Sequence, residues 1–202
     1  MDEYYQTIDQ RGSAEYSDRG SRFIAIATPL SKVEDFKQIL QEIKKEHPKA
    51  VHHCFAYRVG LDGLQFRSSD DGEPSGSAGK PILGQIDSKG LTNTSIIVVR
   101  YFGGTLLGIP GLIKAYKTVA ALVLQTIPTI QKQVEIPVML QFEYAQTSEL
   151  KGLLKQTGAS VLEQEIDLFP YIKAGIPATR LEEFLSKIKG MGNISVKKLV
   201  TL

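Results

Sequence analysis

"TSIIVVRYFGGTLLGIPGLIKAYKTVAALVLQTI" occupies residues 94–127 and contains the elements that decide the fold. It begins with a β-branched run over 94–102, and this composition predicts a strand buried on both faces. A glycine-rich turn follows. The residues after it predict a long helix over 112–127, which ends at Pro128. A buried strand followed by a long apolar helix predicts a domain in which helices pack on a sheet.

The chain before this stretch predicts further strands and helices of the same domain. Residues 1–20 are a polar lead-in with a short edge strand, and 21–28 form a strand. A helix over 31–48 follows, in which Ser31 and Glu34 have the spacing of a capping box. Residues 50–60 and 64–69 alternate as two strands of a hairpin, and 80–90 form a short helix that ends at Gly90.

The pattern restarts near residues 128–134. A strand over 134–144, a helix over 147–158, two strands over 159–168 and 170–178, a helix over 179–192 and a final strand over 193–202 follow in turn. This βαββαβ order predicts a ferredoxin-like fold. The predicted class is therefore α+β, with an amino-terminal domain over 1–131 and a ferredoxin-like carboxy-terminal domain over 132–202.

Composition limits the classes of partner and the compartment. The net charge is only +2, from 24 basic and 22 acidic residues, so no broad basic surface for DNA is expected. The longest aliphatic runs are too short to span a membrane, and the polar amino terminus has no apolar signal core. A single cysteine, Cys54, excludes an intramolecular disulfide and favours a reducing compartment. We therefore expect a cytoplasmic protein without membrane contact.

The polar stretch "SSDDGEPSGSAGKP" (68–81) matches two phosphate or nucleophile motifs only superficially. Gly79-Lys80 is followed by proline where a Walker A loop needs a hydroxyl, so a nucleotide-binding loop is excluded. Ser77 and Lys80 match S-x-x-K, but the S-D-N and K-T-G triplets of that enzyme class are missing. A chance match is the favoured interpretation.

Two further side-chain groups are candidate metal ligands or nucleophiles. Asp70, Asp71 and Glu73 are oxygen ligands without the spacing of an EF-hand, and a solvated turn is the favoured interpretation. On a strand, His52 and Cys54 share one face and His53 takes the other. A small buried cysteine and a structural histidine hydrogen bond are favoured over zinc or a Cys–His nucleophile. We predict no catalytic residue, metal or cofactor.

The glycine-rich turn stands where a strand passes into a helix, a place at which backbone N–H groups can hold an anion. Lys114 and Lys117 lie in the first turns of the helix, although cations there oppose the helix dipole. Together with Arg100 and Lys80 they would suit a negatively charged partner. The alternative is that the glycines only allow close packing and the lysines are solvated, and the sequence favours neither.

Two segments taken together carry a resemblance that covers essentially the whole chain. "RSSDDGEPSGSAGKPIL" followed by "VVRYFGGTLLGIPGLIKAY" resembles the YigZ/IMPACT family, also called UPF0029. The resemblance implies a first domain similar to the second domain of ribosomal protein S5. It also implies a second domain similar to domain V of elongation factor G. The sequence departs from the usual family pattern at Leu106, which replaces a lysine, and at Lys114, which replaces an arginine.

The resemblance implies a link to translation, because eukaryotic IMPACT proteins regulate it through protein binding. We expect a non-enzymatic binding or regulatory protein whose partner is RNA or a ribosome-associated protein; the sequence does not predict the oligomeric state. The alternatives are an enzyme acting on a small phosphorylated or peptidic substrate between 68–81 and 100–114, and an adaptor that pairs with a partner strand. The predicted groove comprises Asp70, Asp71, Glu73, Ser75, Ser77, Lys80, Arg100, Tyr101, Gly103, Gly104, Gly108, Gly111, Lys114 and Lys117.

Overall fold

The computed structural model describes residues 3–61 and 63–199 of the chain and contains two compact units. Tyr5–Lys132 form the first unit. The chain after Lys132 forms the second unit, together with Glu3 and Tyr4. Both units combine antiparallel strands with helices, so the predicted α+β class is confirmed.

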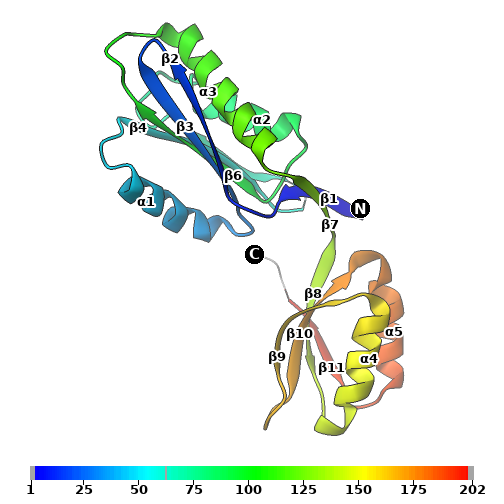
Figure 1. The fold of residues 1–202 in the computed structure, drawn as a ribbon. Coiled ribbons are helices and arrows are strands. Elements are labelled where there is room, and N and C mark those ends of the chain that lie inside the picture. Colours follow the sequence, from blue (N-terminus) through cyan, green and yellow to red (C-terminus); the bar gives the residue numbers. More distant parts are fainter. Residues whose placement is uncertain (1–2, 62, 200–202) are drawn as a thin grey trace. The chain divides into compact units, whose positions relative to one another are not determined.

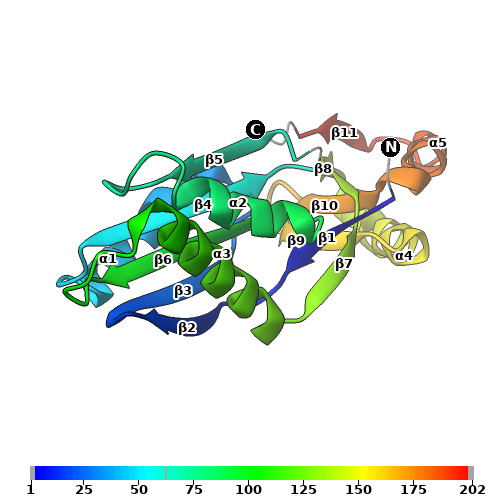
Figure 2. The same cartoon turned by 90° about the horizontal axis from the view of Figure 1, so that it is seen from above.

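The first unit is built on a five-stranded sheet that has helices on both faces. Its strand order is β2 (Gly12–Asp18), β3 (Ser21–Pro29), β6 (Thr94–Tyr101), β4 (His52–Val59) and β5 (Gln65–Ser69). One face carries α2 (Gly79–Ser88) and α3 (Gly108–Thr126), and the other carries α1 (Phe36–Glu46) (Figure 1). Figure 2 shows α2 and α3 side by side over the sheet. Two further strands, β1 (Tyr4–Ile8) and β7 (Thr129–Gln133), pair with each other in a separate two-stranded sheet.

The central strand β6 explains why the sheet has two cores. Ile96 and Val98 pack beneath α2 and α3, whereas Ile97 and Val99 pack against α1. All four are buried, as the β-branched run predicts. Because successive side chains of a strand alternate between faces, Arg100 points to the α2/α3 side.

Three local predictions need correction. The helix after residue 31 begins at Phe36, preceded by a 3-10 turn over Val33–Asp35, and the predicted capping box of Ser31 and Glu34 does not form. The polar lead-in contains the seven-residue strand β2, which hydrogen-bonds to β3 along its whole length. Residues 129–133, at the predicted domain boundary, form the strand β7, where no strand was predicted. Both strands are rich in polar residues because each has an exposed face or edge.

The second unit contains β8 (Glu135–Gln141), α4 (Thr147–Thr157), β9 (Ser160–Glu165), β10 (Tyr171–Pro177), α5 (Leu181–Gly190) and β11 (Ser195–Lys198). This is the predicted βαββαβ order, and the sheet order is β11-β8-β10-β9. Figure 1 shows α4 and α5 on the same face of this sheet. Leu150, Leu154 and Phe184 join strand residues in its core.

No helix within residues 3–61 and 63–199 is long and apolar enough to cross a membrane.

Candidate functional site

A cluster of polar side chains lies at one end of the core between the sheet and α3. The register places Arg100 of β6 beside Phe23 of β3 and His52 of β4. All three point to the α2/α3 side, because they share the strand parity of Ala25, Cys54 and Val98 in that core. A guanidinium at this position needs an acceptor inside the protein, and the loop between β5 and α2 supplies it.

Glu73 from this loop closes the cluster. Its Oε1 accepts hydrogen bonds from Arg100 Nη1 at 2.6 Å and from the Tyr116 hydroxyl of α3 at 2.7 Å. Glu73 is only 9% exposed and Arg100 5%. Burial is the main cause that raises the pKa of Tyr116, so its hydroxyl remains a donor. The loop and the strand–turn–helix segment 94–127 are thus joined by a buried, charge-assisted junction.

Asp70 organises the loop itself. Its Oδ2 accepts from the Gly76 N–H at 2.8 Å, and its Oδ1 accepts from the N–H groups of Ala78 and Gly79 at 2.9 and 2.8 Å. Gly79 begins α2, so the carboxylate satisfies donors at a helix N-terminus that have no partner within the helix. Burial alone would raise the pKa of Asp70, but the three backbone hydrogen bonds outweigh it and lower the pKa.

We expect Asp70→Asn to lower the free energy of unfolding at pH 7 by about 1.5–3 kcal/mol, the usual range for hydrogen bonds to a charged group. Because the folded pKa lies below the unfolded value, the contribution of Asp70 is complete above the unfolded pKa of about 3.9. It is lost as the pH falls through the folded pKa. Urea denaturation followed by circular dichroism from pH 7 to pH 2 should therefore show the difference between wild type and variant shrinking below about pH 4.

The exposed Asp9 provides the control, because Asp9→Asn should produce neither effect. A difference between wild type and Asp70→Asn that stays the same at every pH would contradict the structural role of the Asp70 carboxylate.

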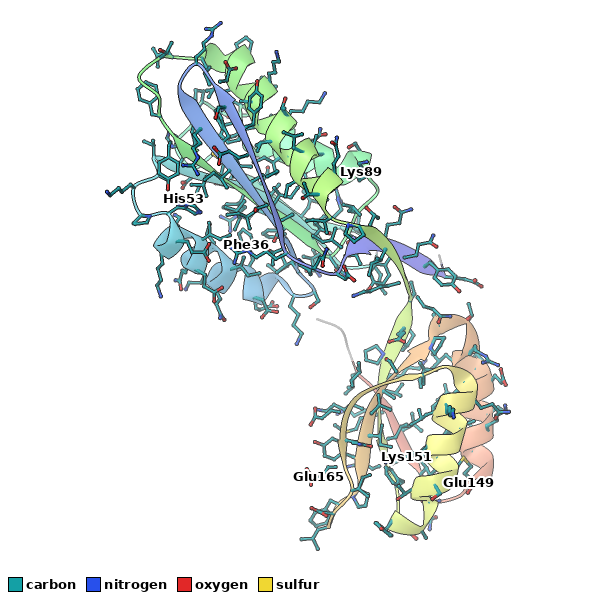
Figure 3. The ribbon with its side chains drawn as sticks, viewed as in Figure 1. Phe36, His53, Lys89, Glu149, Lys151 and Glu165 are labelled. Atoms are coloured by element: carbon teal, nitrogen blue, oxygen red, sulfur yellow. The ribbon has the colours of Figure 1, made fainter. Side chains whose placement is uncertain are left out.

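Asp71 attaches the same loop to β4. Its Oδ2 accepts from the backbone N–H of His53 at 2.6 Å, and its carbonyl oxygen accepts from His52 Nδ1 at 2.8 Å. Figure 3 shows His53 toward the α1 side of the sheet. His52 points to the other face, because successive side chains of a strand alternate. Burial, and then the charge of Lys44, lower the pKa of His53. The predicted structural histidine hydrogen bond is confirmed in His52.

The two candidate nucleophiles, Cys54 and Ser77, are buried and hydrogen-bonded to backbone carbonyl groups. The Cys54 thiol lies 3.0 Å from the Asp70 carbonyl oxygen, and burial raises its pKa to about 12, so it is not a thiolate at neutral pH. Ser77 is fully buried and its hydroxyl donates to the Pro74 carbonyl at 2.6 Å, whereas Lys80 is exposed. Across the ranges 3–61 and 63–199, no three His, Cys, Asp or Glu side chains gather in a way that could hold a metal ion.

The glycine-rich turn touches the β2–β3 turn backbone to backbone. A Cβ atom built on Gly103 would lie 1.8 Å from the carbonyl carbon of Gly20, which itself has φ +78°. The Ser21 hydroxyl accepts from the Gly103 N–H at 3.2 Å and from Arg100 Nη2 at 3.4 Å. At this position the glycine is required by a close approach of two chain segments.

The structure brings the two predicted segments into contact but divides their residues between interior and surface. Glu73, Ser77 and Arg100, which were predicted to line the groove, are buried, and the ion pair and the hydroxyl hydrogen bond satisfy them inside the protein. Asp70 and Asp71 hold backbone groups of the loop and of β4. Tyr101, Gly76 and Gly111 are partly buried. The predicted residues at the surface are Asp71, Ser75, Lys80, Gly103, Gly104, Gly108, Lys114 and Lys117.

The sequence analysis missed two members of the cluster, namely Ser21 and Tyr116. A signal existed for Tyr116, since it lies on the apolar stripe of α3 with Leu112 and Val119. A buried tyrosine usually finds a partner for its hydroxyl. No comparable signal marks Ser21, because its role depends on the approach of Gly103 from a distant turn.

The outer surface of the turn and of α3 is apolar and basic. Phe102, Leu106, Ile109 and Ile113 are large apolar residues exposed by 48, 81, 51 and 39%. Lys114 and Lys117 are exposed beside them. From Ser88 to Val134 the sequence contains no aspartate or glutamate. This surface therefore has a positive field that no nearby carboxylate of the same segment offsets.

Comparisons with known proteins agree with this architecture. The family model described as the Impact N-terminal domain matches residues 19–124. The IMPACT family member YigZ of Escherichia coli is 36% identical over 181 residues, 89% of each chain. Protein IMPACT of Rattus norvegicus is 32% identical over 100 residues, 47% of this chain and 31% of its own. A crystal structure of "an hypothetical protein" superposes with a TM-score of 0.76 and 32% identity over 99% of both chains. The chain therefore belongs to the YigZ/IMPACT family.

Proposed function

We propose that this chain is a non-enzymatic binding and regulatory protein of translation, located in the cytoplasm. Its partner is RNA or a ribosome-associated protein. Its binding surface consists of Ser75, Lys80 and the exposed residues from Phe102 to Lys117. The family supports a regulatory role, since it includes eukaryotic proteins named Protein IMPACT.

The observation that carries the proposal is that the polar side chains of the 68–81 loop form hydrogen bonds with other groups of the protein. Glu73 accepts from Arg100 and Tyr116, Asp70 accepts from three backbone N–H groups, and Ser77 donates to Pro74. A general base or nucleophile must reach the substrate with its reactive atom. These groups instead hold a loop rigidly against the sheet, as a recognition surface requires.

The charge of the surface favours RNA over a protein as the first partner to test. Lys80, Lys114 and Lys117 are exposed cations, and the glycine-rich turn before α3 supplies backbone N–H groups. Both kinds of group bind phosphate oxygens. We also propose that the first unit resembles the second domain of ribosomal protein S5. For the second unit we propose a ferredoxin-like fold similar to domain V of elongation factor G, which its strand order β11-β8-β10-β9 supports.

Filter binding of ribosomal and transfer RNA at two salt concentrations tests this proposal. We expect binding that weakens as salt rises, because phosphate contacts release counterions. Lys114→Ala with Lys117→Ala should weaken binding to all RNAs and reduce the salt slope by about one per lost phosphate contact. The control is Lys151→Ala with Lys155→Ala, two exposed lysines on α4 of the second unit, which should leave binding unchanged.

Absent or salt-independent RNA binding would contradict the RNA proposal and would favour a protein partner instead. Turnover of a phosphorylated or peptidic substrate that is lost in Asp71→Lys would contradict the non-enzymatic proposal.

A further inference from the structure

The surface described above has a defined shape and polarity. Leu106 is 81% exposed in the turn before α3. Ile109, Ile113 and Lys117 follow one another at intervals of four residues, so they share one face of the helix. Together with Lys114 they form a surface that is apolar at the turn and basic further along the helix, and we call these five residues the 106–117 face. Exposed apolar patches of this kind mark sites of association.

The second unit contains a surface with the opposite charge and a concave shape. A hollow of about 450 Å³ lies between the end of β8 and the β9–β10 loop, and its lining includes Glu143, Tyr144, Asp167, Leu168 and Phe169. Leu168 and Phe169 are exposed by 90 and 84%, and Tyr144 by 71%. We call this the 143–169 hollow. Such a hollow suits a ligand with an apolar tip and positive charge.

The sequence around each surface carries charges of one sign only. Residues 88–134 contain no aspartate or glutamate, whereas residues 134–150 and 156–172 contain no lysine or arginine. The segments that line the 143–169 hollow therefore contain no positive side chain that would repel the lysines of the 106–117 face. Because both surfaces belong to the same chain, a second copy of the protein always offers a hollow of opposite charge to the 106–117 face.

We propose that the protein associates head to tail, with the 106–117 face of one molecule docked in the 143–169 hollow of a second. Leu106 enters the hollow against Leu168 and Phe169. Lys114 and Lys117 lie opposite Glu143 and Asp167. The contact is heterologous, so a pair of molecules keeps one free face and one free hollow, and further copies add to form rings or open chains. It also covers lysines of the proposed RNA surface, so RNA binding and self-association compete.

Sedimentation velocity of the full chain, freed of RNA by nuclease treatment, tests this proposal independently of RNA binding. Over roughly 1 µM to 1 mM, a range that covers weak specific association, we expect the mass to rise with concentration. Leu106→Asp and Leu168→Asp each place a charge at an exposed position, and each should leave only monomer. The control Val51→Asp, at a site 55% exposed outside both surfaces, should associate like the wild type.

An equimolar mixture of the Leu106→Asp and Leu168→Asp variants provides the decisive arm. The first variant retains an intact hollow and the second an intact face, so the mixture should form a one-to-one dimer and nothing larger. A wild type that stays monomeric throughout overturns the proposal. So does association that persists in either variant, or a mixture that remains monomeric although each variant alone has lost association.

Discussion

Replacing Arg100 by methionine, or Glu73 by glutamine, is expected to lower the free energy of unfolding of the first unit by about 3–5 kcal/mol. Each change leaves the other partner buried without its counterion. The remaining contacts do not compensate: the Arg100 Nε has no hydrogen-bond partner within residues 3–61 and 63–199, and Ser21 lies at 3.4 Å from Nη2. Urea denaturation at pH 7 measures the loss.

A surface ion pair of the same unit provides the control. Arg11 and Glu46 form an ion pair at 2.8 Å with side chains 48 and 46% exposed. Arg11→Met should therefore cost no more than about 1 kcal/mol, because exposed pairs are hydrated and screened. If Arg100→Met is no more destabilising than Arg11→Met, the Glu73–Arg100 pair is not buried as described.

Gly103→Ala is expected to destabilise the first unit by about 3 kcal/mol or more, at the upper end of the cost of overpacking. The added methyl group would lie 1.8 and 2.2 Å from the carbonyl carbon and oxygen of Gly20, and 2.2 Å from the N atom of Ser21. These are backbone atoms that cannot turn aside as a side chain does. The β2–β3 turn must move away, which also breaks the hydrogen bond from the Gly103 N–H to Ser21.

The matched control adds the same methyl group where there is room. Gly84 lies in α2 with nothing within 4 Å of an added Cβ, so Gly84→Ala should stabilise the protein by about 1 kcal/mol through helix propensity. Thermal melts of both variants compare the two sites directly. Equal melting temperatures for Gly103→Ala and wild type would contradict the contact between the two turns.

The sequence predicts most of the elements because their signals are local. The β-branched run of β6, the apolar stripe of α3 and the left-handed glycines at 90 and 158 each act within a few residues. The missed elements have weak local signals. β2 alternates among small and polar residues and is specified by pairing with β3, and β7 by pairing with β1. The helix start at Phe36 was misplaced because a 3-10 turn replaces the capping box.

The sequence predicts which two segments form the site, but not which of their side chains are buried and paired. The glycines, prolines and carboxylates of residues 68–81 indicate a shaped loop, and the resemblance relates it to the 100–114 turn. Charged side chains are usually exposed, so the sequence gives no reason to bury Glu73 or Arg100 alone. Each is buried because the other, 27 residues away in the sequence, neutralises its charge. Ser21 joins the cluster across 79 residues, through the contact with Gly103.

The central claim is that Glu73 joins the 68–81 loop to β6 and α3, and a double-mutant cycle between Glu73→Gln and Arg100→Met measures this most directly. Glutamine retains an acceptor for the Tyr116 hydroxyl, and the double variant has no buried charge without a partner. We predict that the double variant loses less free energy of unfolding than the two single variants lose together, with a coupling energy of about 2–3 kcal/mol. Additive losses, with a coupling energy near zero, would contradict the account.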